Sequence, residues 1–313
     1  MPWTRCLLFL VVVAGSPARA DPRPPPSCVE DGKPFDPEAI HARLASFAGK
    51  ELDGRAPGSP GDTTARGLIA ERFRCLGLQP AFGSDFAQPF TAASGRATAN
   101  VVGYVAGETD DIIVVAAHHD HLGEGHLGAN DNASGVVALL AIAQAIQQRG
   151  AMPHRTIVFA TFGDEEAGMI GSSYYVAHPP ADLPLAKVVQ VVNLDMVGSY
   201  SSKGFVAAMG TFRRLAGRTL LDELAPTFPR LHVGLGGRAR GSDFEPFCAQ
   251  GIPYVFFWTP DARCYHATCD TVDRIDIPHL VQIAQLAGML TERLAATELE
   301  LLRLKTRLGC FAR

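Results

Sequence analysis

Residues 111–135 read DIIVVAAHHDHLGEGHLGANDNASG, and this stretch indicates how the chain folds. An apolar, β-branched run ends in a cluster of His and Asp residues, and a glycine-bounded polar segment then leads into helical sequence after Ala133. This pattern predicts a buried strand whose carboxyl end carries polar residues, at the edge where the loops of an open α/β sheet converge. Similar runs recur along the chain, so we expect residues that are distant in sequence to meet at that edge.

Strands are predicted at residues 99–105, 111–117, 156–162, 188–194, 203–208 and 253–258. Helical spacing predicts helices at residues 37–49 and 65–77, after Ala133 with Ser134 as its cap, after Gly168, and at residues 213–225, 242–249 and 278–304. Strands that alternate with helices indicate an α/β fold, a three-layer α/β/α sandwich with a mainly parallel mixed central sheet. A chain of 313 residues can form such a core as a single domain.

Five residues that follow the predicted strands can each hold a metal ion: His118, Asp131, Glu166, Asp195 and His266. Two divalent ions need roughly three protein ligands each and a shared water, at a separation of about 3.5–4 Å. Only a carboxylate has two oxygens with which to bridge them. A nitrogen and oxygen set without thiolate favours zinc, and cobalt or manganese would accept the same ligands.

Glu165 and Glu166 are adjacent, so on extended backbone their side chains point to opposite sides. One can bind metal while the other remains free to move a proton. Asp120 lies two residues after His118 and can orient that imidazole from behind. Asp164 is expected to be a turn residue or to face solvent. Four other histidines are expected at the surface or in supporting positions: His119, His121, His126 and His154.

These motifs, from LDGRAPGSPG at Leu52 to DTVDRID ending at Asp276, resemble those of the co-catalytic di-zinc aminopeptidases, of the secreted bacterial leucyl aminopeptidase and aminopeptidase Y type. The resemblance implies a zinc exopeptidase-like fold and two zinc ions per chain. It assigns His118 and Asp195 to one zinc, Glu166 and His266 to the other, Asp131 to both, and the general base to Glu165. It further implies a cis peptide bond between Asp131 and Asn132. The chain departs from the family at Phe244, where a His usually follows the Asp.

The expected reaction is removal of the N-terminal residue of a peptide by a metal-bridging hydroxide, with Glu165 as general base. Met196, Phe256, Phe257 and Tyr265 are candidates for an apolar substrate pocket, which would favour a bulky hydrophobic residue. Two alternatives remain open: a glutaminyl-peptide cyclotransferase with a single zinc, and a non-catalytic binding relative. No G-x-S-x-G, H-E-x-x-H or G-x-x-x-x-G-K-[ST] motif occurs, which argues against a serine hydrolase, a single-zinc helix and a nucleotide site.

The N-terminus predicts export. Residues 1–20 have a basic start, a short apolar stretch and an Ala-Arg-Ala cleavage site, so we expect a signal peptide cleaved after Ala20. A proline-rich leader at residues 21–37, a single peptidase domain at 38–305 and a tail at 306–313 follow. The protein should be secreted or periplasmic, without stable membrane association.

Composition and cysteine usage agree with that destination. The net charge of −4 and the absence of a basic run argue against nucleic acid as a partner. We expect a monomer that acts on peptide or protein N-termini. Six cysteines remain after cleavage, an even number that suits an oxidising compartment. Cys264 and Cys269 bracket His266, so we expect a disulfide between them.

Overall fold

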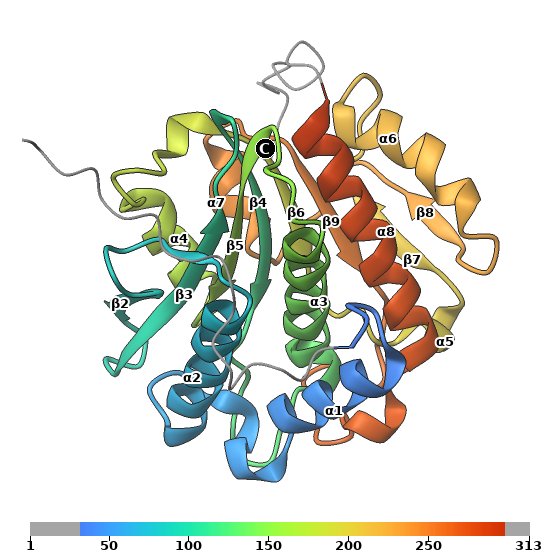
Figure 1. Ribbon diagram of the computed structural model, residues 1–313. Helices are drawn as coiled ribbons and strands as arrows, with labels where there is room; N and C mark the ends of the chain where they lie inside the picture. Colours follow the sequence, from blue (N-terminus) through green and yellow to red (C-terminus); the bar gives the residue numbers. More distant parts are fainter. Residues whose placement is uncertain (1–31, 298–313) are drawn as a thin grey trace, which may run out of the picture.

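The computed structural model describes residues 32–297, in which nine strands form one mixed sheet (Figure 1). The strands are β1 (Gln79–Pro80), β2 (Ala87–Thr91), β3 (Ala97–Val105), β4 (Thr109–His118), β5 (Arg155–Phe162), β6 (Val188–Leu194), β7 (Val206–Met209), β8 (Val233–Leu235) and β9 (Tyr254–Trp258). The α-helices are α1 (Pro37–Phe47), α2 (Pro60–Cys75), α3 (Ser134–Gln148), α4 (Ile170–Ala177), α5 (Tyr200–Lys203), α6 (Ala216–Leu224), α7 (Phe244–Ala249) and α8 (Ile277–Ala296).

The strands lie in the order β1-β3-β5-β4-β6-β9-β7-β8, with β2 paired to β3. The four central strands, β5, β4, β6 and β9, are parallel to one another. The flanks are antiparallel where β3 meets β5 and where β7 meets β9. The mixed sheet with a parallel centre is confirmed, and it brings the carboxyl ends of the four central strands to one edge.

Helices cover both faces of the sheet, which confirms the three-layer sandwich. Along β4, Ile113 and Val115 belong to the larger core, which includes residues of α1, α2, α3, α6 and α8. Their neighbours Ile112 and Val114 belong to a smaller core with residues of α4 and α7 on the opposite face. A strand buried on both sides has no polar face, and this explains its continuous apolar sequence.

Side-chain caps fix the starts of three helices. Asp36 accepts a hydrogen bond from the backbone N–H of Ala39 at the start of α1, and Ser59 accepts one from Asp62 at the start of α2. Asp276 accepts one from His279 at the start of α8. Each of these helices has proline in its first turn, where no backbone donor is needed.

Three predictions of local structure were wrong. Ser134 does not cap α3: its hydroxyl donates to the carbonyl of Asn130, while Asn132 accepts from the N–H of Gly135. The strand predicted at 203–208 begins only at Val206, because α5 ends at Lys203 and Gly204 turns the chain in the left-handed region. The long C-terminal helix ends at Ala296, and the remainder of its predicted range, like residues 1–31, lies outside the described residues.

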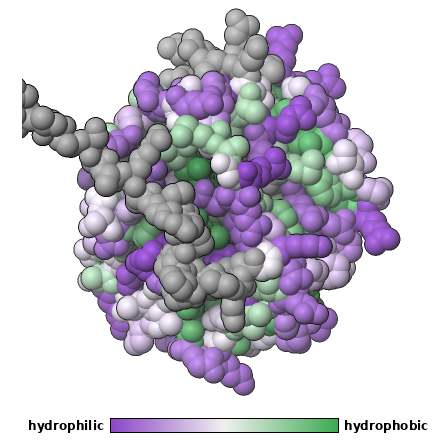
Figure 2. Space-filling view, viewed as in Figure 1, coloured by the Kyte–Doolittle hydropathy of each residue, from purple (hydrophilic) through white to green (hydrophobic). Residues whose placement is uncertain are grey.

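The face that carries α1, α2, α3 and α8 is mainly hydrophilic, with hydrophobic residues in scattered patches (Figure 2). Within residues 32–297, none of the helices has both the length and the apolar composition needed to cross a bilayer.

Candidate metal centre

The five candidate ligands all follow the carboxyl ends of the central parallel strands. His118 is the last residue of β4, and Asp195 comes directly after β6. Asp131 lies in a tight turn at Ala129–Ala133, between β4 and α3. Glu166 follows β5, and His266 lies in the loop after β9. The parallel register therefore brings together side chains that are 148 residues apart in the sequence, from 118 to 266.

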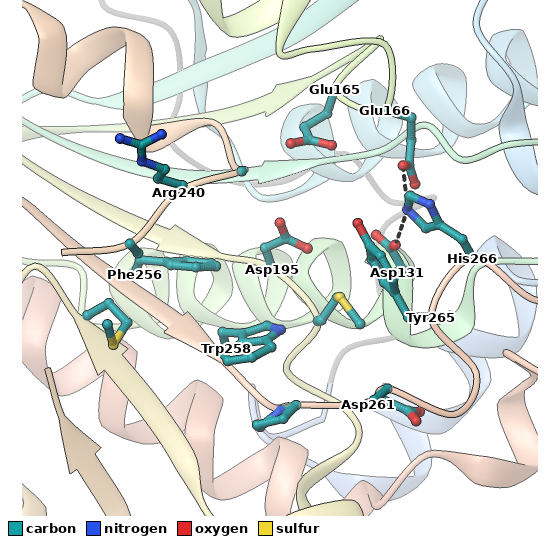
Figure 3. Close-up of a pocket in the computed structure, with 16 residues that line it drawn as sticks. Asp131, Glu165, Glu166, Asp195, Arg240, Phe256, Trp258, Asp261, Tyr265 and His266 are labelled. Carbon is teal, nitrogen blue, oxygen red and sulfur yellow. Dashed lines mark ion pairs between the residues drawn. The ribbon is translucent and has the colours of Figure 1, made fainter. Parts of the chain in front are cut away.

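Asp131 lies at the centre of this group, between two imidazoles. Its Oδ1 is 3.3 Å from Nε2 of His118, and its Oδ2 is 3.3 Å from Nε2 of His266. The other carboxylates extend the group on either side: Asp195 Oδ1 is 3.2 Å from His118 Nε2, and Glu166 Oε2 is 2.8 Å from His266 Nε2. Figure 3 shows His266 between Glu166 and Asp131. The arrangement has two halves that share one carboxylate.

The two adjacent glutamates diverge. Figure 3 shows Glu166 directed to His266, while the carboxylate of Glu165 stands apart from both. Burial raises the pKa of Glu165 well above its usual range; the His118 imidazole opposes this, and the Asp243 and Asp195 carboxylates add to it. Burial would also raise the pKa of Asp131, but hydrogen bonds from the His118 and His266 rings outweigh it and hold that pKa well below its usual range.

Asp120 joins two of the ligand-bearing strands. Its Oδ1 accepts a hydrogen bond from the backbone N–H of Glu165 at 3.1 Å, and its Oδ2 accepts one from Glu166 at 3.4 Å. The His118 ring presents Nδ1 to the same residue, 3.2 Å from the backbone oxygen and 3.7 Å from Oδ1. Asp120 thus lies behind His118, as the spacing predicts, and it also fixes the backbone of the glutamate pair.

Two further residues support the site in roles that the sequence did not predict, although they stand in the DTVDRID and LDGRAPGSPG motifs. The Asp270 carboxylate accepts the backbone N–H groups of Asn130 at 2.7 Å and Asp131 at 2.9 Å. It ties the loop of His266 to the turn that carries Asp131. The second support is Arg55, whose side chain is fully buried and donates to four backbone carbonyl oxygens, those of Phe47, His119, Leu127 and Gly128.

Two expectations about individual residues are confirmed and one is wrong. The peptide bond between Asp131 and Asn132 is cis, and Cys264 forms a disulfide with Cys269. Asp164 is not solvent-facing, because its carboxylate is buried and accepts the N–H of Ala93 at 2.6 Å.

The histidines expected at the surface or in supporting positions lie at different depths. His119 and His121 are fully buried, and His119 lies 3.4 Å from the buried carboxylate of Asp62. His154 is about half exposed, as expected. Consecutive histidines give no hydrophobic period, so the sequence could not show which of them faces inward.

A cavity of about 530 Å³ opens beside Glu165, Glu166 and Asp195. Of the four candidate pocket residues, Met196, Phe256 and Tyr265 line it. Phe257 does not: neighbouring residues of a strand alternate between faces, and its ring is buried in the larger core. Trp258, two residues after Phe256 and on the same face of the strand, lines the cavity instead of Phe257.

Other parts of the cavity wall come from segments that no sequence motif connects with the site. Met209 of β7 lies opposite Phe256 in the antiparallel register, and Arg240 lies on the loop before α7. Only the strand order β9-β7 brings these segments to the cavity, so no local sequence signal could have identified them.

Phe244 stands where the resemblance expects histidine. Its ring is buried and stacks on Tyr254, with 4.0 Å between ring centroids, and it also contacts Phe256 at 5.1 Å. At this position the chain therefore supports the cavity wall by aromatic packing. The preceding Asp243 is fully buried, and burial raises the pKa of its carboxyl above the usual range.

The donor set fits divalent metal ions. Two imidazoles and three carboxylates converge while largely shielded from solvent, and buried carboxylates are costly unless cations compensate them. One oxygen of Asp131 faces each half of the group, as a bridging ligand requires. Imidazole and carboxylate donors without thiolate are typical of zinc, cobalt and manganese sites.

The comparisons with solved structures show the same fold. An aminopeptidase from Aneurinibacillus sp. strain AM-1 superposes with a TM-score of 0.69 at 20% identity, covering 84% of this chain and 95% of that one. A zinc aminopeptidase from Bacillus subtilis gives 0.71 at 17% identity, covering 86% and 97%. A glutaminyl cyclase from Porphyromonas gingivalis gives 0.70 at 19% identity, covering 84% and 100%.

Sequence comparison gives the family. Leupeptin-inactivating enzyme 1 of Streptomyces exfoliatus is 27% identical over 286 residues, which are 85% of this chain and 61% of that protein. Aminopeptidase YwaD of Bacillus subtilis is 31% identical over 188 residues, 56% of this chain and 39% of that protein. The chain thus spans less than two thirds of the length of these relatives. The family model for Peptidase family M28 matches residues 100–291, and the chain belongs to that family.

Proposed function

We propose that this protein is a zinc-dependent aminopeptidase that hydrolyses the N-terminal residue from peptides. The observation that carries the proposal is the placement of Asp131, with one oxygen toward His118 and the other toward His266. In this proposal Asp195 completes the subsite of His118, and Glu166 completes that of His266. The curated relatives named as aminopeptidases support the same reaction class.

Two zinc ions held by these groups would supply an activated water and polarise the scissile carbonyl. Glu165 lines the cavity and stands apart from Glu166 and His266 in Figure 3, so its carboxylate is available to accept the proton of the attacking water. After the carbonyl is attacked, the carboxyl of Glu165 returns that proton to the departing amine. The acidic groups beside the cavity would hold the free α-amino group of the substrate and thereby restrict cleavage to the N-terminal residue.

The cavity supports a preference for bulky hydrophobic N-terminal residues. Met196, Met209, Phe256 and Trp258 give it a largely apolar wall, and about 530 Å³ exceeds the volume of any single side chain. A panel of aminoacyl amides should therefore show the fastest turnover with Leu, Met or Phe. Fastest turnover with Asp, Glu or Arg would reject the preference.

The reaction itself is tested with leucyl-p-nitroanilide, followed while a chelator removes the metal and zinc restores it. Recoverable hydrolysis is the expected result. The main alternative is a glutaminyl-peptide cyclotransferase with one zinc, since a glutaminyl cyclase has the same fold. Cyclisation of glutaminyl peptides without hydrolysis would establish that alternative, and absence of both activities in the zinc-loaded protein would favour a binding protein.

We also propose that the protein is exported, with a signal peptide at residues 1–20, a leader at 21–37 and one peptidase domain over 38–305. The disulfide between Cys264 and Cys269 supports an oxidising compartment, and Cys75 and Cys248 are disulfide-bonded as well. N-terminal sequencing of the mature protein should begin at Asp21. Recovery of the intact N-terminus from the cytoplasm would contradict export.

A further inference from the structure

His121 lies inside the metal centre, although the five-ligand pattern leaves it without a role. Its side chain is fully buried, and its Nδ1 lies 2.5 Å from Oε1 of Glu166. The ring meets that of His266 edge-on, with 5.8 Å between centroids and 69° between planes. His121 therefore contacts one proposed ligand directly and packs beside a second, and its Nδ1 lies 3.9 Å from Oδ2 of a third, Asp131.

The two oxygens of Glu166 face two different imidazoles. Oε1 is hydrogen-bonded to Nδ1 of His121, whereas Oε2 lies 2.8 Å from Nε2 of His266. That same His266 nitrogen is 3.3 Å from Oδ2 of Asp131. Oε2 thus shares the proposed metal subsite with the donors of His266 and Asp131, while Oε1 is held on the other side by His121.

The His121 ring has little room to leave this position. A Cβ on Gly128, whose φ is +62°, would lie 2.6 Å from Cγ of His121, so glycine lets the backbone approach the ring closely. Arg55 holds both ends of the loop, through the carbonyl oxygens of His119 at 2.7 Å and Gly128 at 3.0 Å. The hydrogen bond between His121 and Glu166 is therefore built into the fold of this loop.

We propose that His121 is a positioning residue that donates Nδ1–H to Oε1 of Glu166 and leaves only Oε2 free to bind metal. The inference rests on the proposed function, in which Glu166 and His266 hold one of two metal ions. Groups that hydrogen-bond to ligating carboxylates orient them, and their loss typically weakens metal binding about 10–100-fold. The effect should fall on the His266 subsite and spare the His118 subsite.

The test compares His121→Leu with His121→Asn, which keeps a side-chain donor close to the position of Nδ1. His126→Leu is the matched control, because His126 lies on the same loop and its Nδ1 contacts only the carbonyl of Gly123. Each metal-free protein is titrated with Co²⁺ against a chelator, and the visible absorption of each bound equivalent is recorded. Thermal unfolding of the metal-free proteins shows that all variants are folded.

Wild type, His126→Leu and His121→Asn should each bind two Co²⁺ ions with similar affinities. His121→Leu should bind one ion normally and the other about 10–100-fold more weakly, with an altered spectrum for that ion alone. Equal binding of both ions by His121→Leu and wild type, or equal weakening at both subsites, would overturn the role of His121. Fewer than two ions in wild type would instead overturn the proposed function, and this inference with it.

Discussion

Replacing Arg55 with lysine tests how strongly a buried cation stabilises the loops that carry the proposed ligands. The guanidinium donates from Nε to His119 O at 2.7 Å and from Nη2 to Gly128 O at 3.0 Å. Nη1 donates to Phe47 O at 2.6 Å and to Leu127 O at 2.8 Å. The His119, Leu127 and Gly128 carbonyls lie on either side of the loop segment that carries His121, and the Phe47 carbonyl lies at the end of α1.

The expected loss follows from the geometry of the two cations. A lysine ammonium has all its donors on one atom and cannot reproduce the planar fork, so we expect at least two of the four hydrogen bonds to be lost. A hydrogen bond to a charged group contributes about 1.5–3 kcal/mol, so Arg55→Lys should lower the free energy of unfolding by about 3–6 kcal/mol. At roughly 2 °C per kcal/mol for a chain of this length, Tm should fall by about 6–12 °C.

Thermal unfolding of the metal-free protein, followed by circular dichroism in a chelating buffer, measures this loss without contribution from bound metal. Arg293→Lys is the control, because Arg293 is about half exposed and pairs with Glu223 on the surface. That variant should unfold within about 1–2 °C of wild type, since exposed ion pairs contribute about 0–1 kcal/mol. An Arg55→Lys variant as stable as Arg293→Lys would refute the reasoning.

Three further predictions concern the proposed base and the turn of Asp131. Glu165→Gln should lower kcat about 10²–10⁴-fold with the metal content unchanged. The control Glu124→Gln, at an exposed position, should leave kcat unaltered. Equal kcat for Glu165→Gln and wild type would show that Glu165 is not the general base. Burial raises the pKa of Glu165, so the folded metal-free protein retains a proton that the unfolded chain releases above about pH 4.3. The free energy of unfolding should then decrease as pH rises. Urea unfolding measured between pH 5 and 7 should show that this free energy falls less steeply with pH in Glu165→Gln than in wild type, by up to ~1.4 kcal/mol per pH unit. The same pH dependence in both proteins would contradict this. Asp270→Asn places an amide where a carboxylate accepts two backbone N–H groups, so zinc affinity should fall about 10–100-fold. Chelator competition measures this affinity, and Asp273→Asn, at an exposed position, is the control. Unchanged affinity in Asp270→Asn would show that the hydrogen bonds of Asp270 are not needed for zinc binding.

The sequence was sufficient to predict the central sheet and the edge at which the ligands meet. β6 and the buried part of β4 follow the predicted ranges because strands covered on both faces are continuously apolar. The shorter strands β1, β2 and β8 were not predicted. β1 and β8 have two and three residues, too few for a hydrophobic period, and β2 has Gln88 and Pro89 within its five residues. All three form through pairing with neighbouring strands.

The site could be predicted less completely than the sheet. Charged and imidazole side chains after apolar runs give a clear local signal for the candidate ligands. Arg55 gives no such signal, because its partners are backbone carbonyls from three separate segments. His121 could not be distinguished from its neighbours, since its burial depends on how the loop after β4 folds back toward Glu166.

If Asp131 bridges two metal ions, the number of zinc ions per folded chain should depend on its carboxylate. Native mass spectrometry of the mature protein should show two zinc ions in wild type. Asp131→Asn should retain at most one, because an amide oxygen cannot replace the carboxylate as a bridge. One zinc in wild type, or two in a folded Asp131→Asn variant, would contradict the account.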